Sequence, residues 1–506
     1  MKTGIDLGTT YSLIARLQQD GTPTLLPDSS FREVYSTPSA IYLNDRNAAV
    51  GYLVEALLEE NPELPVLRFF KRNFGAPNPI FLDRAGMAWH AETLAALVLK
   101  KLRFDAESYA GRAMEGAVVT VPAHFHDRQR KAVLNAAALA ELPVLGLVEE
   151  PVAAALHYGV SNTCKDEVLM VYDLGGGTFD VTLLSMDERG VYVLAKDGIT
   201  ELGGKEFDEA IAAMVLEQFR NTHGSPLPMN GLTSLQLRRI SEEIKIELSI
   251  PNKSFLKKTV LIGSHAFEVV VYRKDFEAAI RHMIEQTIEV SMRCLDGAGL
   301  READIGKLML VGGSSMVPSI GQRLGQVFSD SRQRIFHHEP LKAVAYGAAV
   351  HAAQLSGEAE AYEIPPEFRG VTGHHIGIQT INPQTGRMEV DRLIAKNMPL
   401  PAQATRTFYT SSATQTKIRL QVVQYHDPKS ELTPVGELVI GPLANPALNY
   451  PVEVTVENTT DGTIRVRAYD PNTGVELEQE FGASGDGGAS LVLQRNLVRS
   501  TFINHL

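Results

Sequence analysis

The chain has 506 residues, of which 44% are hydrophobic and 21% charged, and its formal net charge is −12. This length supports two to four structural units, each with its own core. The chain has no run of about 18 apolar residues, the length that could span a membrane. Its negative charge and its lack of a Lys/Arg cluster argue against nucleic acid as a partner. The two cysteines, Cys164 and Cys294, lack metal-type spacing, which predicts a reducing, cytoplasmic location.

Up to about residue 355, short apolar strands alternate with long helical patterns, which is typical of an α/β fold. The periodicity predicts helices at residues 91–109, 127–141, 206–219, 234–249, 275–297 and 341–355. An acidic, proline-bearing stretch at residues 357–366 follows and has the composition of a linker.

Beyond this stretch the hydrophobic period falls to two. Apolar residues alternate with polar ones at 418–422, 452–456 and 464–468, and the turn signals Asn382-Pro383, Asp461-Gly462 and Asn472-Thr473-Gly474 separate the runs. The pattern predicts seven or eight short antiparallel strands in a sandwich. After the glycine-rich residues 485–488, the remaining chain is long enough for one short helix.

One short pattern occurs twice, at residues 4–11 and 172–180: an acid at the end of an apolar run, then glycines, then a hydroxyl side chain. The order is typical of a hairpin turn whose backbone N–H groups wrap polyphosphate oxygens, because only glycine lets the main chain come so close. Asp6 and Asp173 would then face each other and hold Mg²⁺ through its waters. A single Asp-Gly is ordinary turn chemistry, whereas a pair indicates a duplicated domain.

Seven motifs extend this pattern: GIDLGTTYS, VVTVPAHF, DLGGGTFDVTLL, LGGKEFD, KIELS, VGGSSMVP and AVAYGAAV. They resemble the DnaK-type heat-shock chaperones, within the actin and sugar-kinase fold superfamily. The resemblance is dense over about residues 1–355. It is weaker through 376–482, where GIQT, LIAKN and the Asp461-Gly462 hairpin are similar to the peptide-binding domain of that family.

The resemblance implies a fold in which an α/β actin-like ATPase domain, duplicated into two lobes, precedes an all-β sandwich. We expect the ATPase domain at residues 1–355, an interdomain linker at 356–373, the β-sandwich peptide-binding domain at 374–488, and a short C-terminal tail or helix remnant at 489–506. The implied cofactors are ATP or ADP with Mg²⁺, and K⁺ is a further candidate.

Catalytic residues are carried over position by position. Lys71 matches the family lysine that reaches the γ-phosphate and orients the attacking water; from the sequence alone it could equally be a solvated surface charge. Glu150 matches a ligand of the magnesium waters and the partner of a proline switch. Thr178 matches a hydroxyl near the γ-phosphate, and Asp180 an acid that polarises water. The resemblance thus assigns catalysis to Lys71, Glu150, Asp173, Thr178 and Asp180, and the metal to Asp6, Glu150 and Asp173.

Nucleotide contacts are carried over in the same way. The phosphate loops supply Gly8, Thr9, Thr10, Tyr11, Gly175, Gly176 and Gly177. Ribose, adenine and the remaining phosphate contacts match Gly203, Gly204, Glu242, Lys245, Ser249, Gly312, Gly313, Ser314 and Met316. Glu242 and Lys245 could instead form an exposed ion pair three residues apart on a helix. Most family members carry an arginine on the adenine face where this chain has Met316, so adenine would lie between apolar side chains.

Two departures concern communication between the domains. Pro122 and Arg130 match the family residues that relay the nucleotide state to the outer face. The linker, however, reads Glu367-Phe368-Arg369-Gly370-Val371-Thr372 where relatives have several leucines that dock as an edge strand. One aromatic replaces that apolar run. We therefore expect weak coupling and weak stimulation by a J-domain co-chaperone.

The peptide-binding half also departs from the family pattern. Ile378, Ile381, Ile418 and Leu420 match the apolar peptide slot, although at a period of two they could equally be plain sandwich core. The helical lid is missing, apart from a stretch at residues 491–498 that could be a remnant of its first helix. A sandwich without a lid should exchange peptide quickly.

These expectations describe an ATP-dependent chaperone that hydrolyses ATP and binds exposed apolar segments of unfolded or dedicated clients. A J-domain co-chaperone and a nucleotide-exchange factor are candidate partners. The alternative is a slow or non-hydrolysing, ATP-loaded scaffold for one dedicated client. A small-molecule kinase of the same superfamily would explain the phosphate loops but not residues 376–482.

Overall fold

The structure is a computed structural model that describes residues 1–31, 33–44, 47–161, 167–187, 190–329, 334–358, 367–382, 385–427, 429–443, 445–480 and 487–504. Cys164, Pro383, most of the acidic linker and residues 485–486 lie outside these ranges. No helix within them is both long and apolar enough to cross a membrane.

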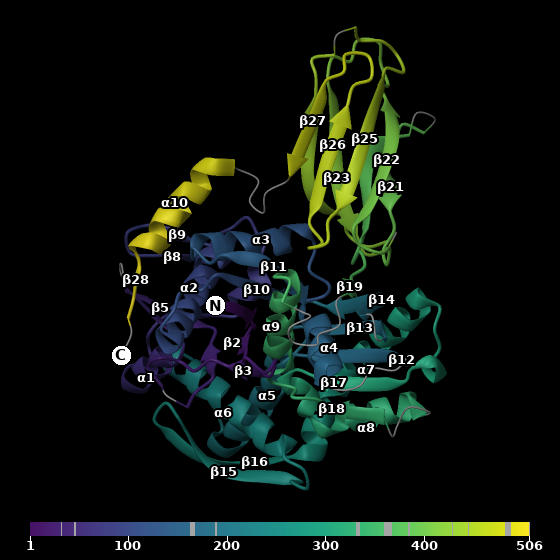
Figure 1. Cartoon of the computed structure of the whole chain (residues 1–506). Helices are drawn as coiled ribbons and strands as arrows, with labels where there is room; N and C mark the ends of the chain where they lie inside the picture. The colour runs from purple at the N-terminus through teal and green to yellow at the C-terminus, as the bar shows by residue number, and fades with distance from the viewer. Residues whose placement is uncertain are drawn as a thin grey trace.

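Two large central sheets form the framework of residues 1–370 (Figure 1). The first has the order β11-β10-β1-β2-β3, with β4 also on β2, and the second has the order β18-β17-β12-β13-β14-β19. The strands are β1 (Lys2–Asp6), β2 (Tyr11–Leu17), β3 (Pro23–Leu25), β4 (Ser36–Pro38), β10 (Gly116–Val121) and β11 (Val144–Glu149), then β12 (Glu167–Leu174), β13 (Phe179–Met186), β14 (Gly190–Ile199), β17 (Lys307–Val311), β18 (Ile335–His337) and β19 (Glu367–Arg369).

The second sheet repeats the strand connectivity of the first. In each, a strand pairs antiparallel with the next strand along the chain and parallel with a later one, as β1 does with β2 and β10 and β12 does with β13 and β17. The two phosphate-type motifs occupy the equivalent turns, between β1 and β2 and between β12 and β13. The duplication expected from the paired motifs is therefore visible in the strand order.

Helices cover both sheets (Figure 1). They are α1 (Tyr52–Glu60), α2 (Ala91–Ala110), α3 (Asp127–Leu139), α4 (Glu150–Ser161), α5 (Gly204–His223), α6 (Gly231–Ser249), α7 (Arg273–Ala298), α8 (Pro318–Val327) and α9 (Ala343–Leu355), with 3₁₀ turns η1 (Phe70–Asn73), η2 (Glu302–Asp304) and η3 (Gly313–Met316). Smaller sheets comprise β5 (Ala40–Asn44), β6 (Asn47–Val50) and β7 (Val66–Arg68), the pair β8 (Phe81–Leu82) and β9 (Ala88–Trp89), and the hairpin β15 (Phe255–Ile262) and β16 (His265–Tyr272).

The longest helix shows why these segments are helical. In α7, Phe276, Ile280, Ile284 and Ile288 recur every four residues, so they share one face, and all four are buried. The helix ends at Gly299, whose φ of 68° is left-handed, a conformation that favours glycine.

Residues 375–480 form two four-stranded sheets, in the orders β21-β20-β23-β24 and β22-β25-β26-β27. Their strands are β20 (His375–Ile381), β21 (Met388–Ile394), β22 (Ala402–Tyr409), β23 (Ile418–Tyr425), β24 (Thr433–Ile440), β25 (Pro451–Asn458), β26 (Ile464–Tyr469) and β27 (Glu476–Glu480). The alternating valines at 452, 454 and 456 are fully buried between the sheets. The hydrophobic period of two thus arises because each strand buries one of its two faces.

The linker pairs with the second central sheet. β19 lies parallel to β14, with Phe368 opposite Val191. Phe368 packs against the core between the central sheets and edge-on to His351, their ring centroids 5.4 Å apart, while Val371 is 3% exposed. This pairing needs no run of leucines, because ladder hydrogen bonds do not depend on side-chain identity and two apolar residues still supply burial. How strongly the two halves communicate stays a prediction.

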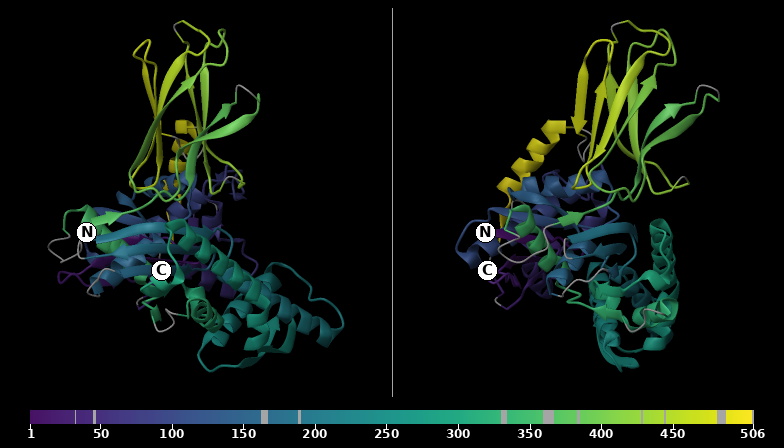
Figure 2. Two further views of the ribbon diagram at one scale, coloured as in Figure 1. Left: turned by 90° about the vertical axis from the view of Figure 1, so that its right-hand side faces the viewer. Right: turned by 45° about the vertical axis from the view of Figure 1, so that its right-hand side comes forward.

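The sandwich stands directly on the first half of the chain (Figure 2). The Asp127 carboxylate accepts a hydrogen bond from the Ile464 backbone N–H at 2.6 Å, and Lys131 Nζ donates to the Ile464 carbonyl at 3.1 Å. Asp127 and Lys131 also form an ion pair of 2.9 Å, and both are buried. On the side of β14, Asp197 faces His426 at 3.3 Å and Lys396 at 3.5 Å. The docked surface is therefore mostly polar and charged.

The C-terminal segment returns to the first half of the chain. Helix α10 (Gly487–Ser500) lies against α2 and α3, and strand β28 (Phe502–Ile503) pairs parallel with β6 (Figure 1). Val498 and Ile503 are 1% and 4% exposed and belong to the core around α2. Burying each side chain contributes about 1.5–3 kcal/mol. The sequence predicts the helix but gives no sign of the strand.

Candidate functional site

The two glycine-rich turns touch each other. A Cβ atom added to Gly177, in the β12–β13 turn, would lie 2.7 Å from Thr9 Cγ2 in the β1–β2 turn, so no other residue fits there without movement. Gly176 is similarly close to the hydroxyl of Thr10. The structure therefore brings both predicted phosphate loops into one place, with the backbone of each open to close approach.

Other predicted nucleotide loops meet the same turns. Ser314 Oγ donates to the Gly175 carbonyl at 2.8 Å, and the backbone N–H of Gly204 donates to that carbonyl at 3.0 Å. Gly312 has a φ of 80°, and a Cβ there would lie 2.6 Å from the Asp173 carboxylate. Segments far apart in sequence thus converge on the second phosphate turn.

Three carboxyl groups gather beside these loops: Asp173 and Glu150, which are buried, and Asp6, which is half-buried. Burial and the nearby Glu150 raise the pKa of Asp6 to about 7, and the same two causes raise the pKa of Asp173 well above its usual value. Lys71 opposes both shifts. This excess of buried negative charge favours a cation.

Within the described ranges, no three metal-ligating side chains lie close enough to hold a bare ion directly. The carboxylates nevertheless fit a hydrated divalent cation, which Mg²⁺ prefers because it dehydrates reluctantly. Coordination through water, as the sequence predicts, remains a prediction.

Lys71 is fixed rather than solvated. It lies in η1, is 3% exposed, and forms a buried ion pair with Glu150, which begins α4. Its ammonium also lies 5.9 Å from the centre of the Phe125 ring. A small cavity of about 10 Å³ is lined by Lys71, Thr9 and Thr178, among others. The lysine and the two hydroxyl side chains therefore face one space next to the phosphate loops.

Arg72 is a site residue that the sequence reading missed. Its guanidinium donates to both oxygens of Glu206, at 2.8 and 2.9 Å, and to the Gly177 carbonyl at 2.9 Å. Glu206 in turn accepts from the backbone N–H of Gly203 at 2.8 Å. This bidentate pair joins two of the loops. The only sequence feature that could have indicated Arg72 is that it is a second cation directly after Lys71.

Asp180 has a partner that the sequence did not predict, His124. Its Oδ1 atom accepts from the His124 backbone N–H at 3.1 Å and lies 2.8 Å from His124 Nδ1. Asp180 is 1% exposed and is paired with Asp173 in the strand register. The acid assigned to polarising water is therefore held in place by a histidine from the loop after β10.

The predicted nucleoside residues lie on α6, but their contacts differ from an ion pair along the helix. Lys245 pairs with Asp208 at 2.8 Å and donates to the Gly204 carbonyl at 3.2 Å. Burial raises the pKa of Asp208 to about 6. Ser249 Oγ donates to the Lys245 carbonyl at 2.8 Å, and Glu242 is half-buried. Lys245 thus connects α6 with the start of α5 at the second phosphate loop.

Met316, which the resemblance places on the adenine face, and the apolar Ile246 are both available to a ligand. Met316 in η3 is 47% exposed, and Ile246 on α6 is 58% exposed. Replacing Met316 by arginine adds a cation that can stack on an adenine ring, worth about 0.5–2 kcal/mol. We expect Met316→Arg to bind ATP about threefold to thirtyfold more tightly in a calorimetric titration. Unchanged or weaker binding would mean that adenine lies elsewhere.

Arg130 connects the site to the sandwich. Its guanidinium donates to the Phe125 carbonyl at 3.0 Å, to Glu149 at 2.6 Å and to the Asp461 carbonyl at 3.1 Å. Pro122, also predicted for the relay, is buried just after β10. The structure gives Arg130 partners in both halves, and its role as a relay remains a prediction.

Most of the predicted peptide-slot residues lie inside the sandwich. Ile378, Ile418 and Leu420 are at most 6% exposed and belong to its core, whereas Ile381 is 58% exposed. In this arrangement only Ile381 can contact a peptide without movement of the strands. Peptide binding by the other three remains a prediction.

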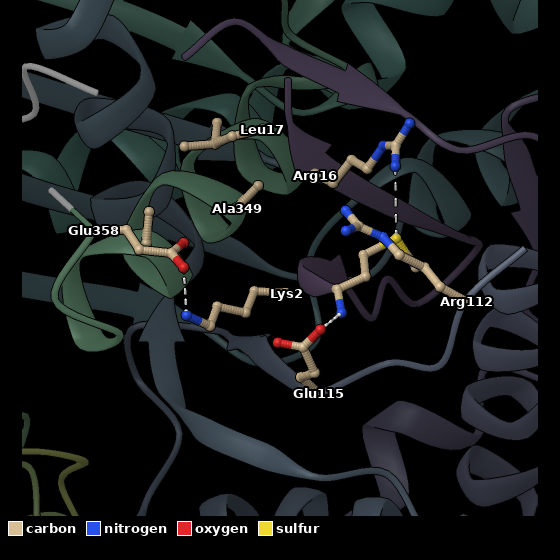
Figure 3. A pocket seen from close by; sticks show the side chains of 9 residues that line it. Lys2, Arg16, Leu17, Arg112, Glu115, Ala349 and Glu358 are labelled. Atoms are coloured by element: carbon tan, nitrogen blue, oxygen red, sulfur yellow. Dashed lines mark hydrogen bonds and ion pairs between the residues drawn. The ribbon is translucent and has the colours of Figure 1, made fainter. Parts of the chain in front are cut away.

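A larger cavity, of about 170 Å³, lies between β1, β2 and α9, beside Lys2, Leu17 and Ala349 (Figure 3). Its walls carry paired charges: Lys2 with Glu358, and the N-terminal ammonium with Glu115. Arg16 and Arg112 also line this cavity, and none of the predicted nucleotide residues does.

Comparison with known proteins agrees with the motifs. The family model described as Hsp70 protein matches residues 2–491. Proteins named chaperone protein DnaK from Thermotoga petrophila and Thermotoga maritima are 32% identical over 486 residues, which covers 94% of this chain and 79% of theirs. The namesake from Thermosipho melanesiensis is also 32% identical, with 94% and 78% covered. The chain belongs to the Hsp70 family.

Proposed function

We propose that this chain is an ATP-dependent molecular chaperone in which a two-lobed, actin-like ATPase domain acts on a β-sandwich that binds exposed apolar segments of client proteins. One observation carries the proposal. Two glycine-containing turns from duplicated sheets touch each other beside a buried lysine and three carboxyl groups, two of them buried and one half-buried. That combination suits a polyphosphate with a divalent cation.

In this proposal the chain's own residues position the reaction. Phosphoryl transfer to water needs little covalent help, so most of the work is orientation and neutralisation of charge. Lys71, held by Glu150, would meet the γ-phosphate and orient the attacking water, with Thr178 beside it. Asp180, fixed by His124, would polarise that water. Mg²⁺, held through water by Asp6, Glu150 and Asp173, would neutralise charge on the phosphates.

The partners follow from the same assignment. The client would be an unfolded or dedicated polypeptide, and a J-domain co-chaperone, a nucleotide-exchange factor and K⁺ are further candidates. The low cysteine content supports a cytoplasmic location. The relatives' printed name, chaperone protein, supports the client-binding role at the level of the family.

Binding of a fluorescent apolar peptide, followed by anisotropy in the presence of ATP, tests the client-binding half. We expect saturable binding that a second unlabelled apolar peptide displaces and a charged peptide of equal length does not. A parallel sugar-phosphorylation assay should show no product. Peptide that never binds, together with phosphorylated sugar, would favour a small-molecule kinase.

A slow or non-hydrolysing scaffold for one client remains the second candidate. The direct docking of the sandwich through Asp127 and Lys131 favours it, because opening would break both hydrogen bonds to the Ile464 backbone. The rate of ATP hydrolysis separates this candidate from the chaperone.

A further inference from the structure

The sandwich is anchored to the rest of the molecule at both of its ends. Before it, β19 is the edge strand of the second central sheet. After it, α10 and β28 lie on the opposite side, against α2, α3 and β6 (Figures 1 and 2). The two anchors therefore hold different parts of the first half of the chain.

The second anchor is built into the fold rather than resting on its surface. The Asn504 N–H donates to the Ala48 carbonyl at 3.0 Å, which continues the pairing of β28 with β6. Lys100 on α2 donates to the carbonyls of Val498 and Thr501, at 3.2 and 2.9 Å. These two donations satisfy carbonyls at the end of α10 that the helix itself leaves unpaired.

The chain between the sandwich and this anchor is short. Six residues separate the end of β27 at Glu480 from the start of α10 at Gly487, and the seven steps between these two Cα atoms span at most about 25 Å when fully extended. A sandwich that leaves its docked position thus stays within that distance of α10. A tether this short keeps the effective concentration of the docking surface at about the millimolar level or above, so redocking is favoured.

We propose that residues 487–504, here called the clasp, hold the sandwich against the ATPase domain in every nucleotide state. This deepens the proposed function by naming how it is regulated: lasting separation of the sandwich from the ATPase domain requires release of the clasp and not only a change of nucleotide. A ligand shifts a conformational equilibrium only by its different affinities for the two states. A nucleotide that does not release the clasp leaves the arrangement docked.

Amide hydrogen exchange of residues 461–466 measures undocking directly, because the Ile464 N–H is bonded to Asp127 across the interface. In the full chain we expect exchange rates within about threefold of each other with ADP, with ATP and without nucleotide. The measurement needs neither hydrolysis nor a bound peptide, so its failure and a failure of the proposed function are distinguishable.

Two adjacent residues of β28 provide matched variants. Ile503 is 4% exposed and Phe502 is 64% exposed. Ile503→Asp places a charge in the core and should release the clasp, raising exchange at residues 461–466 at least tenfold with ADP. Phe502→Asp adds the same charge at the surface and should leave exchange unchanged.

A protease site introduced between Glu480 and Gly487 separates tethering from stability, since the clasp stays seated after cleavage. Exchange at residues 461–466 should rise at least tenfold on cleavage, while the Asn504 amide stays protected. The proposal is overturned if the intact chain already shows a tenfold difference between ADP and ATP. It is equally overturned if cleavage and Ile503→Asp both leave exchange unchanged.

Discussion

Replacing Lys71 by alanine should lower the single-turnover rate of ATP hydrolysis at least about a hundredfold. The lysine lies in the cavity next to Thr178, where its charge would act on the transferring phosphoryl group, and removing one such preorganised donor typically costs about 10²–10³ in rate. ATP affinity should stay within about threefold, because the glycine-rich loops remain.

The matched control is Lys257→Ala, which removes a lysine that is 58% exposed and paired on the surface with Glu268. It should hydrolyse ATP like the parent chain. Circular dichroism must show that Lys71→Ala is folded, because the change leaves Glu150 without its partner. Hydrolysis by Lys71→Ala at the parent rate would show that the carried-over mechanism is wrong.

Asp127→Ala should loosen the docked sandwich strongly. The carboxylate accepts from the Ile464 N–H and pairs with Lys131, so its removal leaves a buried charge uncompensated. Breaking one side of a buried pair costs about 3–5 kcal/mol. Amide exchange at residues 461–466 should therefore accelerate by about two to four orders of magnitude, while the clasp keeps the sandwich close.

Asp20→Ala removes a fully exposed carboxylate and serves as the control for the loss of one negative charge. It should leave exchange at residues 461–466 unchanged. If Asp127→Ala also exchanges at the parent rate, the contact across the interface does not hold the sandwich, and the docked arrangement has another cause.

Local chemistry explains what could be read from the sequence. The phosphate loops are predictable because each needs an acid, glycines and a hydroxyl within a few residues, and Gly177 shows the close approach that requires glycine. Helices such as α7 are predictable because their buried residues repeat every four positions. The alternating strands of the sandwich are predictable for the same reason, with a period of two.

Long-range contacts explain what could not be read. Arg72 and Glu206, or Asp127 and Ile464, meet only in the fold, and no periodicity links them. The pairing of β19 could not be read from the linker either, because side-chain composition says little about ladder hydrogen bonds, which β19 forms without a leucine. The predicted peptide-slot residues Ile378 and Leu420 are buried in the core of the sandwich. The sequence could not decide this, because core residues and ligand-facing residues of a strand both recur with a period of two.

Single-turnover hydrolysis of ATP, measured with and without a saturating apolar peptide, tests the central claim most directly. The account predicts hydrolysis that depends on Mg²⁺ and on Lys71, and a change of less than about threefold on adding peptide, because the clasp keeps the domains docked. If ATP remains intact when Mg²⁺ is present, the ATPase assignment is wrong, and the non-hydrolysing scaffold is the remaining candidate. A hundredfold stimulation by peptide would contradict the clasp and restore full coupling between the domains.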